Sequence, residues 1–157
     1  MACVGTLNFA ILINGVPTGF FKGKRDLRQG CPLSPLLFLI VIDGLSRLIN
    51  EAKDRGVIKG VRITDAYALS HILYVDDVLL FGGNNRREWR AFAEIINIFC
   101  LASGMAISST KSRLITMDGE ADPKIIDCFP YQVLKLNEGF TYLGFLLKPC
   151  GYTKHDW

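Results

Sequence analysis

This 157-residue sequence predicts an α+β fold in which two helices pack on one face of an antiparallel sheet. Two stretches carry apolar residues at helical spacing, and they alternate with short apolar or alternating stretches typical of strands. Strong turn signals at Asn14-Gly15 and Asp76-Asp77 predict two hairpins. An order of hairpin, helix, hairpin, helix and further strands favours helices that cover one face of the sheet.

The composition predicts one domain, or part of one, with ample apolar residues for a core. No run of about 18 uninterrupted apolar residues occurs, so we expect no membrane contact. The first residues lack the layout of a signal peptide. The five cysteines are scattered, odd in number and without a Cys-x-x-Cys pair. They argue against a zinc site or disulfide framework and suit an intracellular, reducing compartment, either nucleus or cytoplasm.

Positive charge is concentrated between residues 22 and 28. Lys22, Lys24, Arg25 and Arg28 stand there against one acid, Asp26. Such a cluster can follow a phosphate backbone, and it can equally be a solvated loop.

The first predicted element is a hairpin around Asn14-Gly15, with strands over Leu7–Ile13 and Val16–Phe21. A helix then follows from Pro35 to about Lys53. Ser34 is expected as its N-cap, with Pro35 in the first turn. Its apolar stripe consists of Leu37, Val41, Leu45 and Leu48, widened by Leu36, Ile40 and Ile49.

A short strand is expected within Val57–Ile63, followed by two strands, Ser70–Tyr74 and Val78–Phe81, on either side of Asp76-Asp77. Asn85 and Glu88 resemble a capping box that starts the second helix. Helical spacing of Trp89, Phe92, Ile96 and Phe99 continues to Ser103, and Gly104 is the expected C-cap.

The last third of the chain predicts three short strands and a long loop. The strands are Met105–Ile107, Leu114–Met117 and Phe140–Leu147. The loop is the acidic segment Gly119–Pro130, which contains proline.

Two adjacent carboxylates, Asp76 and Asp77, stand between two apolar runs. The pair can be a polar turn, since turns favour Asp. It can also be a divalent-metal site, because Mg²⁺ takes oxygen ligands and often binds one or two carboxylates. Neighbouring strand residues face opposite sides, so one ion can be shared only at a turn. A two-metal site for phosphoryl transfer needs a further carboxylate from another strand.

Tyr74-Val75-Asp76-Asp77 resembles the catalytic tetrapeptide of reverse transcriptases. Upstream, the segment Arg28–Phe38 (RQGCPLSPLLF) resembles the Arg-Gln-Gly-x-Pro-x-Ser-Pro motif of plant-like non-LTR (LINE-type) retrotransposons. Downstream, Ser103–Ser112 and Tyr142-Leu143-Gly144 resemble the next two motifs. Group II intron and retroviral enzymes are more distant alternatives. Two positions depart from the family pattern: Val75 stands where Ala is usual, and Cys31 where many plant relatives have Asp.

The resemblance implies a partial reverse transcriptase domain over residues 1–157, with its palm subdomain at 5–147. It implies an RNA-directed DNA polymerase that uses an RNA template, a DNA primer and deoxynucleoside triphosphates, with Mg²⁺ (or Mn²⁺) as cofactor. The metal ligands would be Asp76 and Asp77, and Lys111 would act near the leaving pyrophosphate. The residues implied in substrate and template binding are Arg28, Gln29, Gly30, Tyr74, Tyr142, Leu143 and Gly144.

The family's first catalytic aspartate belongs on a strand before the Asn14-Gly15 hairpin, and nothing before Leu7 supplies it. We therefore expect the fingers, the first catalytic strand and the thumb to be missing, and the chain alone not to polymerise DNA. Whether this chain is itself an enzyme stays open. The alternatives are a nucleic-acid-binding module without catalysis and a decayed retroelement remnant.

Overall fold

The computed structural model describes residues 8–22 and 32–154. The chain divides into two compact units, residues 1–42 and 43–157. Helices alternate with short strands, so the predicted α+β class is confirmed. The prediction of one antiparallel sheet is wrong, because the strands of the described residues pair two by two in six separate sheets, one of them parallel.

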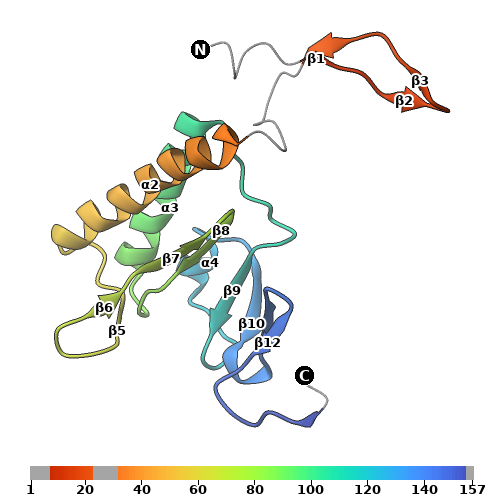
Figure 1. Ribbon diagram of the computed structural model, residues 1–157. Helices are drawn as coiled ribbons and strands as arrows, with labels where there is room; N and C mark the ends of the chain where they lie inside the picture. The colour runs from red at the N-terminus through yellow and green to blue at the C-terminus, as the bar shows by residue number, and fades with distance from the viewer. Residues whose placement is uncertain (1–7, 23–31, 155–157) are drawn as a thin grey trace. The chain divides into compact units, whose positions relative to one another are not determined.

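The first unit contains the predicted hairpin (Figure 1). Strand β1 (Asn8–Phe9) pairs with β4 (Phe21–Lys22), and β2 (Leu12–Ile13) pairs with β3 (Val16–Pro17). The turn residues Asn14 and Gly15 have φ angles of 49° and 82°, a left-handed conformation that Asn and Gly tolerate. The predicted long strands are interrupted in the middle of the hairpin, where the Thr18 side chain accepts from the backbone N–H of Ile11 at 3.0 Å.

Helix α2 (Leu33–Asp54) confirms the first predicted helix. It begins at Leu33, so the prediction of Ser34 as N-cap is wrong. Pro35 still lies in the first turn. N–H groups there have no partner within the helix, so the missing N–H of proline costs no hydrogen bond. Gly56, with a φ of 72°, follows the end of the helix, and its N–H donates to the Lys53 carbonyl.

The buried side of α2 differs from the predicted stripe. Ile42, Leu45 and Ile49 are buried, whereas Leu36, Ile40 and Val41 are exposed. By length and composition alone, α2 is apolar enough to cross a membrane. Leu45 and Ile49 are buried within the second unit, as core residues are.

Strands β5 (Val61–Arg62) and β6 (Ala68–Leu69) form a small antiparallel pair. The predicted strand over Val57–Ile63 is shorter than expected, because Gly60 has a φ of 71° and so lies outside the β region. A Cβ at Gly60 would lie 2.3 Å from the Leu69 carbonyl oxygen, so only glycine fits there. Lys53 ties this pair to α2, since its Nζ donates to the Ala68 carbonyl at 2.5 Å.

The strands predicted on either side of Asp76-Asp77 are confirmed as β7 (His71–Tyr74) and β8 (Asp77–Leu80). Their antiparallel register runs from His71 opposite Leu80 to Tyr74 opposite Asp77. The Phe81 N–H donates to the Ser70 carbonyl at 2.8 Å and continues the pairing beyond the strands.

Helix α3 (Arg86–Ser103) confirms the second predicted helix. The Asn85 side chain caps it by accepting from the N–H of Arg87, and Gly104 closes it with a φ of 73°. Phe92 and Phe99 are buried in the core, as their spacing predicts. The predicted capping box is wrong in one part: the Glu88 carboxylate accepts from other backbone groups instead of from Asn85.

The predicted loop over Gly119–Pro130 contains a short helix, α4 (Pro123–Ile126). Asp122 caps this helix and Pro123 occupies its first turn, a signal present in the sequence. The helix lies in the crossover between β9 (Arg113–Thr116) and β10 (Gln132–Lys135), which pair in parallel. Parallel strands need such a long connection, and this explains the departure from an antiparallel sheet. The strand predicted over Met105–Ile107 does not form.

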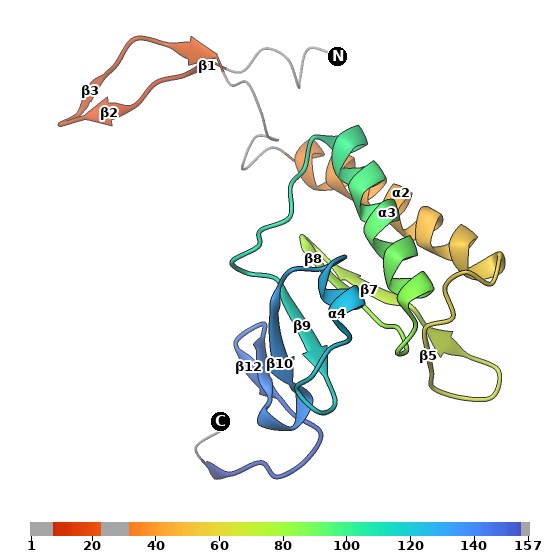
Figure 2. The same cartoon turned by 180° about the vertical axis from the view of Figure 1, so that it is seen from behind.

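The C-terminal segment is a hairpin rather than the predicted single strand. After a 3₁₀ turn, η1 (Leu136–Glu138), strand β11 (Phe140–Tyr142) pairs with β12 (Phe145–Leu147). Leu143 and Gly144 turn the chain with φ angles of 51° and 84°. Figures 1 and 2 show α3 above the β7–β8 hairpin, and β9, β10 and β12 below it.

Candidate active site

Asp76 and Asp77 lie at the tip of the β7–β8 hairpin. Tyr74 and Asp77 form its last residue pair, so Val75 and Asp76 are the two turn residues. Val75 has a φ of 51°, which is rare for a β-branched residue and indicates a strained turn. Neighbouring residues within a strand face opposite sides of the sheet. Asp76 stands in the turn and not in the strand, so its side chain and that of Asp77 can face the same ion.

Both carboxylates are exposed. The ion pairs among the described residues join Asp43 to Arg47, Glu51 to Arg55 and Glu94 to Arg90, and none includes Asp76 or Asp77. Water therefore compensates two adjacent negative charges that would be costly in the interior. A cation bound here would find both carboxylates accessible.

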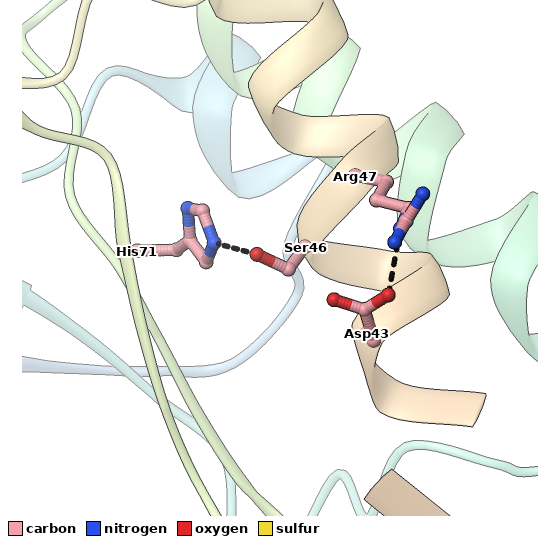
Figure 3. Close-up of polar contacts among 4 residues, drawn as sticks. All are labelled: Asp43, Ser46, Arg47 and His71. Atoms are coloured by element: carbon pink, nitrogen blue, oxygen red, sulfur yellow. Dashed lines mark hydrogen bonds and ion pairs between the residues drawn. The ribbon is translucent and has the colours of Figure 1, made fainter. Parts of the chain in front are cut away.

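The base of the hairpin is attached to α2 through His71. Its Nε2 lies 2.9 Å from the Ser46 hydroxyl (Figure 3). Its Nδ1 lies 3.0 Å from the Ser70 hydroxyl. Burial, and secondly the charge of Lys53, lower the pKa of His71. A neutral ring donates from one nitrogen and accepts at the other. His71 is thus a structural link between helix and hairpin.

Asp43 stands near this link on α2 but points to Arg47, with 2.6 Å between the carboxylate oxygen and Nε (Figure 3). It is engaged in a pair within its own helix. Asp43 therefore adds no third carboxylate to Asp76 and Asp77.

A second attachment holds the exit of β8. Glu88 is almost fully buried, and its Oε1 accepts from the N–H groups of Lys59 at 2.8 Å and Gly60 at 2.7 Å. Its Oε2 accepts from the N–H of Gly83 at 3.1 Å, while Trp89 Nε1 donates to the Gly83 carbonyl at 2.8 Å. The sequence signal for this role of Glu88 is weak, because an acid at this helical position is typical of a local cap.

Tyr142 is the last residue of β11, directly before the turn of the β11–β12 hairpin. Its hydroxyl oxygen is buried and has no hydrogen-bond partner among the described residues. Burial raises the pKa of Tyr142, and the charges of Asp77 and Tyr74 raise it further. Leu143 and Gly144 form the turn that follows. The charges of Tyr74 and Asp77, residues of a distant motif, thus act on Tyr142.

Lys111 lies in an exposed turn after α3, where its N–H donates to the Ser108 carbonyl at 3.2 Å. Within the described residues, no hydrogen bond or ion pair joins its ammonium group to Asp76 or Asp77. Arg28, Gln29 and Gly30 lie outside the described residues, as does most of the basic cluster.

The carboxylates at the hairpin tip supply some, but not all, of the ligands that a divalent cation needs. In residues 8–22 and 32–154, no group of three or more His, Cys, Asp or Glu side chains could hold a metal. Two accessible carboxylates are nevertheless the protein ligands that Mg²⁺ often uses when water and substrate phosphates complete its coordination.

Comparison with known proteins identifies the family. The family model described as reverse transcriptase (RNA-dependent DNA polymerase) matches residues 3–147. The chain belongs to the reverse transcriptase family. This confirms the family that the four sequence motifs predict.

Two known proteins are similar in sequence to this reverse transcriptase chain. It is 27% identical over 152 residues to the retrovirus-related Pol polyprotein from type-1 retrotransposable element R2 of Popillia japonica, covering 92% of the chain and 24% of that protein. It is 40% identical over 76 residues to an uncharacterized mitochondrial protein of Arabidopsis thaliana, covering 46% of the chain and 62% of that protein. The chain thus spans less than two thirds of either relative.

Proposed function

We propose that this chain is the palm part of an RNA-directed DNA polymerase and that Asp76 and Asp77 bind the divalent cations of its reaction. The observation that carries the proposal is an exposed carboxylate pair at the tip of a hairpin held at both ends of its base, in a chain of the reverse transcriptase family. A rigid support of this kind is what a metal site requires. The palm would comprise residues 5–147.

When bound, Mg²⁺ or Mn²⁺ would activate the primer hydroxyl and stabilise the leaving oxygen in an in-line displacement. Asp76 and Asp77 would hold the cations, and Lys111 would neutralise charge on the leaving pyrophosphate. Tyr74 would support the primer end, and Tyr142-Leu143-Gly144 would hold the primer strand.

The proposal extends to the residues that read the substrates. Arg28 would contact phosphate or template, while Gln29 and Gly30 would lie against the incoming deoxynucleotide and the RNA template. Glycine permits a close approach of the backbone. The parent element's template RNA would pair with a DNA primer in this site.

We propose further that the chain alone does not polymerise DNA, since a two-metal site needs another carboxylate. The described residues offer two at the hairpin tip. The first catalytic strand, the fingers and the thumb would lie outside these residues.

Primer extension on an RNA template with Mg²⁺ tests both statements. The chain alone should give no incorporation. Incorporation that Asp76→Asn abolishes and Asp65→Asn leaves intact would establish the polymerase and overturn the proposed inactivity. Asp65 is an exposed aspartate outside the hairpin and serves as the matched control.

The role of Asp76 and Asp77 has a separate test in Mn²⁺ binding, because it needs no catalysis. We expect binding weaker than micromolar that Asp76→Asn removes and Asp65→Asn does not. Micromolar or tighter affinity would show a further ligand in the chain.

A nucleic-acid-binding module without catalysis is the second candidate. It is favoured by the basic cluster at residues 22–28 and by the absence of a third carboxylate at the described hairpin tip. Binding to a primer–template that weakens with salt and is unchanged by Asp76→Asn and by divalent cations would support it over the polymerase.

A further inference from the structure

One buried carboxylate, that of Glu88, holds the two ends of the β7–β8 hairpin together. Its side chain is only 1% exposed, and its two oxygens accept from three backbone N–H groups. A buried carboxylate is costly without such hydrogen bonds, so these groups must stay close to it. Glu88 therefore fixes the relative positions of two chain segments that are far apart in the sequence.

The first of these segments lies against the start of β7. The N–H of Gly60 donates to Oε1 of Glu88 at 2.7 Å. A Cβ on Gly60 would lie 2.3 Å from the Leu69 carbonyl oxygen and 3.1 Å from the Cα of Ser70, so the two backbones are in contact. Leu69 and Ser70 directly precede His71, the first residue of β7. Through Gly60, Oε1 thus holds the entry of the hairpin.

The second segment is the exit of β8. The N–H of Gly83 donates to Oε2 of Glu88 at 3.1 Å, and the Gly83 carbonyl accepts from Nε1 of Trp89 at 2.8 Å. A Cβ on Gly82 would lie 3.2 Å from the Trp89 ring and 3.3 Å from the carboxyl carbon of Glu88, so the chain passes close to both side chains. Both polar groups of the Gly83 backbone are therefore bonded, and Oε2 holds the exit of the hairpin.

The hairpin depends on these attachments because its sheet has only two strands. Among the described residues, β7 and β8 pair with each other and with no further strand. A two-stranded hairpin by itself is marginally stable in water. Movement at its base changes how Asp76 and Asp77 lie at its tip, whereas a divalent cation needs its carboxylate ligands in a defined arrangement.

We propose that Glu88 is a positioning residue for cation binding. By closing the base of the β7–β8 hairpin, it tightens the binding of a divalent cation by Asp76 and Asp77 at the tip. Glu88 does not touch the cation, because its oxygens are occupied by backbone N–H groups at the other end of the hairpin. The inference rests on the proposed function in one respect, namely that Asp76 and Asp77 bind the cation.

Glu88→Gln opens one side of this closure. A carboxamide has one oxygen that accepts and one NH₂ group that donates. If the oxygen stays with the N–H groups of Lys59 and Gly60, the NH₂ group faces the N–H of Gly83, and two donors form no hydrogen bond. The exit of β8 is then released while the entry of β7 keeps its attachment.

The first experiment is a Mn²⁺ titration of the full chain followed by electron paramagnetic resonance. Glu88→Gln should weaken Mn²⁺ binding by about three- to tenfold, a usual size for residues that act on a site without contacting its ligand. Glu94→Gln makes the same change on the exposed side of α3, where it removes the pair with Arg90, and should bind as the parent chain does. Ile125→Val removes one methylene from the core and controls for a general loss of stability.

The second experiment measures backbone hydrogen exchange in the absence of metal. The N–H of Phe81 donates to the Ser70 carbonyl at the base of the hairpin. In Glu88→Gln its exchange should accelerate by a larger factor than that of the Phe99 N–H within α3, because local opening exposes only the amides near it. Equal acceleration at both positions would assign Glu88 a role in global stability alone and overturn the inference.

The outcomes distinguish this inference from the proposed function. If Asp76→Asn weakens Mn²⁺ binding and Glu88→Gln does not, the positioning role is wrong and the metal site stands. Equal weakening by Ile125→Val would trace the effect to lost stability and also overturn the inference. Should Glu88→Gln not fold, Trp89→Phe decides, since it removes the bond to the Gly83 carbonyl and keeps an aromatic ring: weaker binding supports the role, and parent-like binding overturns it. If no Mn²⁺ binding depends on Asp76, the metal site and the inference both fail.

Discussion

The hydroxyl of Ser46 lies 2.9 Å from Nε2 of His71, and this contact joins α2 to the first residue of β7. His71 is also bonded to Ser70, so its ring is held on both sides. At the exit of β8, Gly83 is held by Glu88 and Trp89. The carboxylates at the tip are thus carried on a hairpin whose base is attached twice.

Ser46→Ala should destabilise the chain by about 1 kcal/mol, the usual net value of one hydrogen bond. The imidazole nitrogen left without its partner is half-buried, which is why a loss is expected. Urea unfolding followed by circular dichroism measures it. Ser109→Ala, at an exposed position of the loop after α3, should change the stability by less than the experimental error. An equal effect of both variants would mean that the link to His71 contributes nothing.

The stability of the chain should fall as the pH is lowered below about 6.5, the ordinary pKa of histidine. The folded chain has a lowered pKa at His71, mainly through burial. The unfolded chain therefore binds the proton more readily, and protonation favours unfolding. The contribution of neutral His71 is complete above the unfolded pKa and is lost as the pH falls through the folded one.

Unfolding midpoints measured between pH 4 and pH 8 test this dependence. His71→Gln should flatten the profile in the window just below about pH 6.5. A profile that keeps its slope in His71→Gln would assign the pH dependence to another group.

Glu88→Ala should be the most destabilising of these substitutions, by at least about 1–3 kcal/mol, the cost of one buried donor left without its partner. It leaves three backbone N–H groups, of Lys59, Gly60 and Gly83, without the carboxylate that they share. Chemical denaturation measures the loss. The matched control is Glu94→Ala on the same helix, which removes an exposed pair with Arg90 worth about 0.3–0.5 kcal/mol. Similar losses in both variants would contradict the anchoring role of Glu88.

Val75→Asn should stabilise the chain by about 0.5–1 kcal/mol, because asparagine tolerates the left-handed conformation better than a β-branched residue does. Val75 has a φ of 51° and an exposed side chain, so little packing is lost. The same change at Val78, within the regular strand β8, should destabilise. A rise in the thermal midpoint for Val75→Asn and a fall for Val78→Asn is the expected pair of results.

The amino-acid sequence alone predicts the elements whose signals are local. The Asn14-Gly15 turn, helix α3 with its caps at Asn85 and Gly104, and the strands around Asp76-Asp77 all follow from turn chemistry and apolar spacing. Each of these signals involves only a few neighbouring residues, so it can be recognised without knowing how the elements pack. The family motifs likewise singled out the carboxylate pair.

The contacts between groups far apart in the sequence depend on tertiary packing. Glu88 reads as a local cap, yet its partners at Lys59 and Gly60 lie 29 and 28 residues away. The parallel pairing of β9 with β10 is also not marked by any periodicity in the sequence. Such contacts depend on how whole elements pack against each other, and a residue's neighbours in the chain do not record that packing.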